Sequence, residues 1–128
     1  MPDDVQSQTE QKLAEELLRI HLQSYGRGAG SARVYLHDDL VVALLDELEL
    51  MPNEEFLIDN GQEDGVVQLR GRFEQAIETT FRAAVERVTG RETTSFASVT
   101  RVDDPNYALE VFRLGERKEV DIGDLPDA

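Results

Sequence analysis

One order of structural elements occurs twice in this chain, and it limits the possible folds more than any other feature. In both copies a helical segment ends at a Gly-Arg pair, a strand follows, an aspartate-rich turn comes next and a second strand returns. In the first copy these parts are Tyr25-Gly26-Arg27, a strand to His37, Asp38-Asp39, and a strand from Leu40 to Leu48. In the second copy they are Thr89-Gly90-Arg91, a strand to Val102, Asp103-Asp104-Pro105-Asn106, and a strand from Tyr107 to Leu114. The chain is therefore predicted to contain two αββ units.

Hydrophobic spacing predicts where the helices lie. Ser7 and Glu10 have the spacing of a capping box, so the first helix is expected to begin at Ser7 and the residues before it to be disordered. Apolar residues three and four positions apart predict a short helix from Pro52 to Ile58 and one long helix from Val66 to Val88. The resulting order predicts an α+β fold: a duplicated αββ unit forms a four-stranded sheet with two long helices on one face.

The length of 128 residues is sufficient for one hydrophobic core and short for two. A single domain is therefore expected over residues 7–114. Residues 115–128 are acidic and weakly apolar, and they are predicted to form a mobile tail unless Val120, Ile122 and Leu125 dock on the domain.

The strand from Leu40 to Leu45 is apolar on both of its faces. Helices are expected to cover one face, so the other face is expected to meet a second subunit, most simply in a twofold dimer. The pattern predicts that Val41, Ala43 and Leu45 form the oligomer face. Their alternates Leu40, Val42 and Leu44 fit equally well, because alternation defines two sets of residues without saying which set faces outward.

The charge of the chain excludes several classes of function. The formal net charge is −14, and 11 of the 13 basic residues are arginine, with Lys12 and Lys118 as the two lysines. Such a surface repels nucleic-acid phosphates and anionic lipids. Many carboxylates with few lysines are typical of proteins that work in molar salt, where the Debye length falls to about 3 Å and acidic groups hardly repel one another. An ordinary acidic protein with a basic partner is the alternative.

Other composition features indicate a soluble, cytoplasmic protein. The chain has no cysteine, which excludes disulfides, thiol catalysis and thiolate metal sites. It has no apolar run near the roughly 20 residues that span a bilayer. Asp3 and Asp4 stand where a signal peptide has basic residues.

Several segments resemble a small family that is named for MpsC, an accessory component of a Na⁺-translocating, membrane-potential-generating system. The segments that carry the resemblance are Tyr25-Gly26-Arg27-Gly28, Asp39-Leu40-Val41-Val42, Leu50-Met51-Pro52-Asn53-Glu54, Thr89-Gly90-Arg91 and Glu110-Val111-Phe112. The resemblance implies an association with cation or inorganic-carbon transport at a membrane. One departure is Met51, where the family tends to have a threonine as helix cap, so that cap is expected to be weaker by about 1 kcal/mol.

The glycine-rich segment from Gly26 to Gly30 invites comparison with a phosphate-binding loop. It follows the end of a helix, however, whereas phosphate loops precede a helix, where the backbone dipole is positive. Gly26 and Gly90 are therefore interpreted as structural helix caps. Arg27 and Arg91, with Tyr25, remain candidates for contact with an anion or a partner.

The sequence contains no recognisable catalytic or metal-binding motif. The two histidines, His21 and His37, lack further ligands at zinc spacing and are expected to lie on the surface or half-buried. No serine or threonine stands in a nucleophile motif. No cofactor and no metal are expected.

Two functional hypotheses remain. The first is a non-enzymatic accessory or interaction protein, homo-oligomeric, that acts beside a cation or inorganic-carbon membrane transport system without inserting into the membrane or binding nucleic acid. The second is a small anion or nucleotide sensor that uses the Gly-Arg elements at Arg27 and Arg91.

Overall fold

The computed structural model describes residues 2–115, with side chains from residue 4 onward. In chain order the elements are α1 (Pro2–Tyr25), β1 (Ala29–His37), β2 (Leu40–Leu48), α2 (Pro52–Asp59), α3 (Glu63–Ala76), α4 (Glu78–Thr89), β3 (Thr93–Arg101) and β4 (Tyr107–Leu114). The predicted tail lies, apart from Gly115, outside the described residues.

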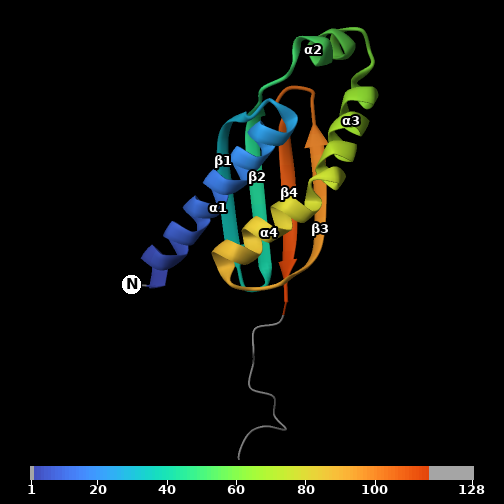
Figure 1. Cartoon of the computed structure of the whole chain (residues 1–128). Helices are drawn as coiled ribbons and strands as arrows, with labels where there is room; N and C mark the ends of the chain where they lie inside the picture. The colour runs from blue at the N-terminus through green and yellow to red at the C-terminus, as the bar shows by residue number, and fades with distance from the viewer. Residues whose placement is uncertain (1, 116–128) are drawn as a thin grey trace, which may run out of the picture.

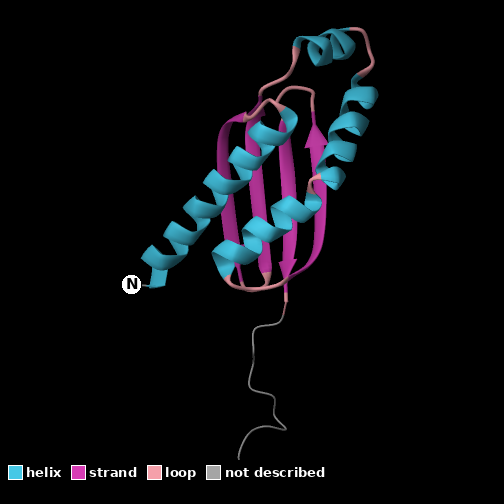
Figure 2. Cartoon of the chain, in the orientation of Figure 1, coloured by secondary structure: helices cyan, strands magenta, loops and turns pink. Residues whose placement is uncertain are grey.

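The four strands form one antiparallel sheet with the order β1-β2-β4-β3. Each hairpin contributes an outer and a central strand, and β2 pairs with β4 in the middle. The prediction of an α+β fold with a four-stranded sheet is confirmed. Figure 1 shows α1 and α4 crossing the same face of the sheet, and Figure 2 shows the two layers by element type. α2 lies beyond one end of the sheet, and α3 runs beside β3.

The hydrophobic core lies between this sheet face and the two crossing helices. Its fully buried members come from α1, β2, α4 and β4, among them Leu13, Leu17, Val41, Ala43, Leu45, Phe81, Val85 and Phe112. The prediction that Val41, Ala43 and Leu45 form the oligomer face is therefore wrong. These side chains have no exposed surface because α1 and α4 cover them, and the opposite face carries their alternates Leu40, Val42 and Leu44, which are half-buried.

The first helix begins earlier than predicted, at Pro2, so Ser7 is not its cap. The Glu10 carboxylate, which the capping box requires, accepts a hydrogen bond from the Leu36 backbone N–H at 2.8 Å instead. β1 is an edge strand, and the Gln6 side-chain amide also donates to the Leu36 carbonyl at 2.9 Å. The polar side chains near the helix start therefore bond to the free edge of the sheet.

The long helix predicted from Val66 to Val88 is interrupted at Ile77, which separates α3 from α4. Ile77 has φ −102° and ψ 8°, outside the helical range, although its N–H still donates to the Phe73 carbonyl at 3.0 Å. The bend lets α4 cross the sheet while α3 passes along its edge (Figure 1). Apolar spacing does not reveal the bend, because Ile77 itself still packs against the core.

Candidate functional site

Six ionisable side chains are buried together with the apolar core or at its border. We call them the buried polar cluster: His21 and Tyr25 from α1, Glu54 from α2, Arg70 and Glu74 from α3, and Glu110 from β4. Their exposed fractions are 4%, 8%, 2%, 2%, 2% and 0%, respectively. Charged side chains are rarely buried to this extent unless they are paired, so the cluster is the part of the molecule whose chemistry most needs an explanation.

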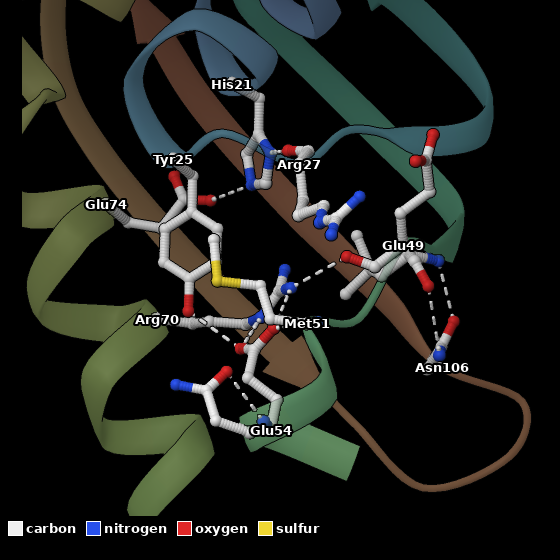
Figure 3. A network of polar contacts seen from close by, with 11 residues as sticks. His21, Tyr25, Arg27, Glu49, Met51, Glu54, Arg70, Glu74 and Asn106 are labelled. Atoms are coloured by element: carbon white, nitrogen blue, oxygen red, sulfur yellow. Dashed lines mark hydrogen bonds and ion pairs between the residues drawn. The ribbon is translucent and has the colours of Figure 1, made fainter.

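Arg70 and Glu54 form the centre of the cluster. The Arg70 Nε and Nη2 groups donate to the two oxygens of the Glu54 carboxylate at 2.7 and 2.9 Å (Figure 3). Arg70 Nη2 also donates to the Glu49 carbonyl at 3.2 Å. This forked geometry matches the planar guanidinium to the planar carboxylate and connects α3 to α2, while the bond to Glu49 connects α3 to the segment that leads into α2.

The start of α2 explains why Glu54 points inward. Pro52 occupies the first turn, and the Glu54 carboxylate accepts the Met51 backbone N–H at 2.8 Å, which is one half of a capping box. Burial by itself raises the pKa of Glu54. Hydrogen bonds from Arg70, the Met51 N–H and Tyr25 outweigh that effect and hold the pKa below its usual range.

Tyr25 closes the cluster from the end of α1. Its hydroxyl donates to the Glu54 carboxylate at 2.7 Å, and the Arg70 guanidinium carbon lies 4.4 Å from the centre of its ring. The Phe73 ring meets the Tyr25 ring edge-on, with the centroids 4.7 Å apart. Burial, followed by the hydrogen bond to Glu54, raises the pKa of Tyr25 to about 12, so the phenol stays neutral across the physiological range.

A second branch of the cluster runs from His21 through Glu74 to Glu110. The His21 Nδ1 atom lies 3.0 Å from the Arg27 carbonyl oxygen, and Nε2 lies 3.5 Å from the Glu74 Oε1 atom (Figure 3). Glu110 lies on the core face of β4, opposite Ala43 on β2 and Ser98 on β3. Burial, and after it the neighbouring Glu74, raises the pKa of Glu110 well above its usual range.

The structure does not bring the three candidate contact residues together. Tyr25 is buried in the cluster, whereas the Arg27 side chain is exposed and contributes its backbone carbonyl. Arg91 lies at the opposite end of the sheet. Its guanidinium donates to the Asp38 carbonyl at 2.6 Å and to the Gly115 carbonyl at 2.8 Å, and so links the β1–β2 turn to the end of β4. A single anion site that uses both arginines does not fit this arrangement.

Both Gly-Arg glycines have the left-handed backbone that the cap interpretation requires. Gly26 has φ +83° and Gly90 has φ +70°. Each N–H bonds to a carbonyl four residues earlier, in Leu22 at 2.9 Å and in Glu86 at 2.8 Å. The expectation that both histidines are surface or half-buried is wrong for His21, because α3 and the turn after α1 cover it. His37 is exposed.

Four residues of the cluster are not among the site residues expected from the sequence: Glu54, Arg70, Glu74 and Glu110. A signal was nevertheless present for three of them. Arg70 and Glu74 fall on the same helical stripe as Val66 and Phe73, where core residues are expected. Glu110 stands between Ala108 and Phe112 on the inward side of an alternating strand. A charged residue at a core position is a stronger signal than any pair of surface carboxylates in so acidic a chain.

Comparisons with known proteins identify a family for the chain. The profile of the family described as Na⁺-translocating membrane potential-generating system (MpsC) matches residues 5–115. No curated protein and no solved structure matches the chain. Between residues 2 and 115, no helix has the length and apolar character needed to cross a membrane. Within the same range, no group of three or more histidine and carboxylate side chains is arranged to hold a metal ion.

Proposed function

The chain belongs to the MpsC family, and from this membership we propose that it is a non-enzymatic accessory protein of a Na⁺-translocating, membrane-potential-generating system. It works in the cytoplasm as a homodimer and contacts the transport machinery through protein surfaces. The observation that carries this proposal is an apolar sheet face that no part of the described chain covers.

This outer face is the side of the sheet that points away from α1 and α4. The strand register places nine apolar or aromatic side chains on it: Tyr35, Leu40, Val42, Leu44, Ala97, Val99, Tyr107, Leu109 and Val111. Tyr35 and Val99 are 50% and 58% exposed. A contiguous exposed apolar surface on a sheet is a common sign of a protein interface.

The charges around the outer face favour a second copy as the occupant. Three arginines on this face each pair with an acid: Arg33 with Asp46 at 3.8 Å, Arg101 with Asp103 at 3.0 Å, and Arg113 with Asp39 at 2.8 Å. The face is therefore close to neutral in a chain whose net charge is −14. Two copies meet with the least electrostatic repulsion where their surfaces are neutral and apolar.

A different surface is available to the membrane partner. α2 and the start of α3 extend beyond the end of the sheet (Figure 1). α2 carries two large exposed apolar side chains, Phe56 and Leu57, which are 67% and 38% exposed, and Leu69 in the middle of α3 is 52% exposed. An apolar projection from a rigid sheet suits insertion into a groove of another protein.

Light scattering in molar KCl tests the dimer. The wild-type protein is expected to have twice the chain mass of 14.4 kDa, and Leu44→Asp on the outer face to have the mass of one chain. Phe56→Asp is the matched control, because it places the same charge on an exposed apolar position of α2 and leaves the dimer intact. A wild-type mass of one chain at micromolar concentration would contradict the dimer.

Affinity capture from native cells in their own salt tests the partner. Wild-type protein is expected to recover an integral membrane protein of a cation-translocating system, and Phe56→Asp to lose it while remaining dimeric. Recovery of the same membrane protein by the wild type and by Phe56→Asp would rule out the α2 surface. Failure to recover any membrane protein would contradict the accessory role.

A further inference from the structure

The branch of the buried polar cluster formed by His21, Glu74 and Glu110 contains more acceptors than donors. Both oxygens of Glu110 and the Oε2 oxygen of Glu74 are buried, and no hydrogen-bond donor among residues 2–115 reaches them. An unpaired carboxylate oxygen in a protein interior is costly, because water no longer solvates it. These three oxygens therefore need a ligand that supplies positive charge.

The hydrogen-bond geometry at His21 shows where one proton lies. Its Nδ1 atom faces the Arg27 carbonyl oxygen at 3.0 Å, and because a carbonyl can only accept, Nδ1 carries a hydrogen. Its Nε2 atom faces Glu74 Oε1 at 3.5 Å. That contact is a hydrogen bond only if a hydrogen lies between the ring nitrogen and the carboxyl oxygen.

The Glu74 carboxyl group lies within hydrogen-bond reach of Glu110, and this contact needs a proton of its own. Two carboxylates have no hydrogen to share, and two negative charges side by side in a buried site strongly repel each other. One proton converts the contact into a hydrogen bond between a carboxylic acid and a carboxylate, as in other carboxyl pairs that cannot both ionise. The raised pKa of Glu110, which burial and then Glu74 cause, agrees with this state.

We propose that Glu74 and Glu110 form a buried binding site for a single proton, which lies between the two carboxyl groups beside the His21 ring. With this proton bound, the pair consists of one carboxylate and one carboxylic acid. We infer a proton in place of a metal cation because, among the described residues, no group of three or more histidine and carboxylate side chains is arranged to hold a metal ion.

The elements around the site determine which other charges act on it. α1 contributes His21 and Tyr25, α2 contributes Glu54, and α3 contributes Arg70 and Glu74. Glu110 lies on β4, and its neighbours on the adjacent strands, Ala43 on β2 and Ser98 on β3, are uncharged. Arg70 forms its ion pair with Glu54, and its Nη1 atom finds no partner within residues 2–115, so it does not neutralise Glu110.

Loss of the proton leaves a net negative charge between α3 and β4. Because Glu74 belongs to α3 and Glu110 to the central strand β4, the repulsion acts between this helix and the sheet. The site thereby makes the packing of α3 dependent on proton concentration.

The test compares unfolding of the wild type and of Glu110→Gln between about pH 5 and pH 9 in constant molar KCl. Because the folded pKa of Glu110 is raised above its ordinary value of 4.5, its contribution to stability is present below that value and is lost as pH rises through the folded pKa. One additional proton in the folded state increases the unfolding constant about tenfold per pH unit in that window. Glu110→Gln, which imitates the protonated acid, is expected to lose this slope and to be more stable than the wild type at pH 9.

Glu55→Gln is the matched control, because Glu55 is exposed on α2 and its replacement keeps the wild-type slope. Equal slopes in the wild type and in Glu110→Gln would overturn the proposal. If Glu110→Gln does not fold, the ¹³C shift of the Glu110 carboxyl in the wild type gives a direct reading. A protonated shift at pH 7 supports the site, and an ionised shift overturns it. Replacing KCl by NaCl is expected to change neither result, and a shift that follows the Na⁺ concentration would mean that the ligand is a metal cation.

Discussion

Replacing Arg70 by methionine is expected to destabilise the protein strongly while keeping the volume of the side chain similar. The change removes both hydrogen bonds to the Glu54 carboxylate, the bond to the Glu49 carbonyl and the contact with the Tyr25 ring. It leaves the Glu54 carboxylate 2% exposed, with the Met51 N–H and the Tyr25 hydroxyl as its donors. Removing one partner of a buried ion pair costs about 3–5 kcal/mol, and we expect a loss in this range.

The loss is measured by chemical denaturation in molar salt at pH 7. Arg72→Met is the matched control, since Arg72 lies on the same helix with an exposed side chain, and its replacement should change stability by less than about 0.5 kcal/mol. The double variant Glu54→Gln with Arg70→Met removes the negative charge of Glu54, which Arg70→Met alone leaves buried without its ion-pair partner. It is expected to be more stable than Arg70→Met alone, and the double-mutant cycle gives the coupling between the two groups.

The pH dependence checks the cause of the loss. In the wild type the pKa of Glu54 is lowered, so its stabilising contribution is present above the ordinary value and is lost as pH falls through the folded pKa. In Arg70→Met the hydrogen bonds from the guanidinium are gone and burial remains, so the pKa of Glu54 rises. The variant should therefore recover part of its stability between pH 7 and pH 5. A loss below about 1 kcal/mol at pH 7, or a loss that does not change with pH, would refute this reasoning.

Three further predictions concern the caps and the charges. Gly90→Ala should lower the free energy of unfolding by about 1 kcal/mol or more, because alanine tolerates the left-handed backbone poorly, and an unchanged denaturation midpoint would contradict the cap. Arg91→Ala should lower the free energy of unfolding by about 1–3 kcal/mol, because the guanidinium of Arg91 donates to two carbonyls. Arg27→Ala should lower it by only about a few tenths of a kcal/mol, because the Arg27 side chain is exposed. Equal losses in chemical denaturation would contradict the structural role of Arg91. The melting temperature should rise between about 0.1 M and 3 M KCl, because salt screens the −14 charge, and a flat profile would refute adaptation to high salt.

Elements that depend on local chemistry were predictable from the sequence. The strand from Tyr107 to Leu114 occurs with the predicted bounds, because alternation and the turn before it are properties of adjacent residues. The short helix that begins at Pro52 differs from its prediction by one residue at its end. The left-handed backbone at Gly26 and Gly90 has the same local origin, since only glycine adopts it without strain.

Features that depend on contacts between distant segments were not predictable with the same certainty. Glu10 has the spacing of a helix cap, but the free edge of β1 at Leu36 provides a competing partner. The bend at Ile77 leaves the apolar spacing intact, because the residue packs against the core on either path. Neither outcome can be read from the segment itself.

The sequence by itself determined the order of helices and strands apart from the break at Ile77, the acidic composition and the family. Only the tertiary structure decided that Val41, Ala43 and Leu45 face the helices, because alternation along a strand does not tell one face from the other. Only the tertiary structure brought Glu54 beside Arg70 and Glu74 beside Glu110, because each pair joins elements far apart in the chain. Local patterns follow from neighbouring residues, whereas burial and the chemistry of buried charges follow from which elements pack together.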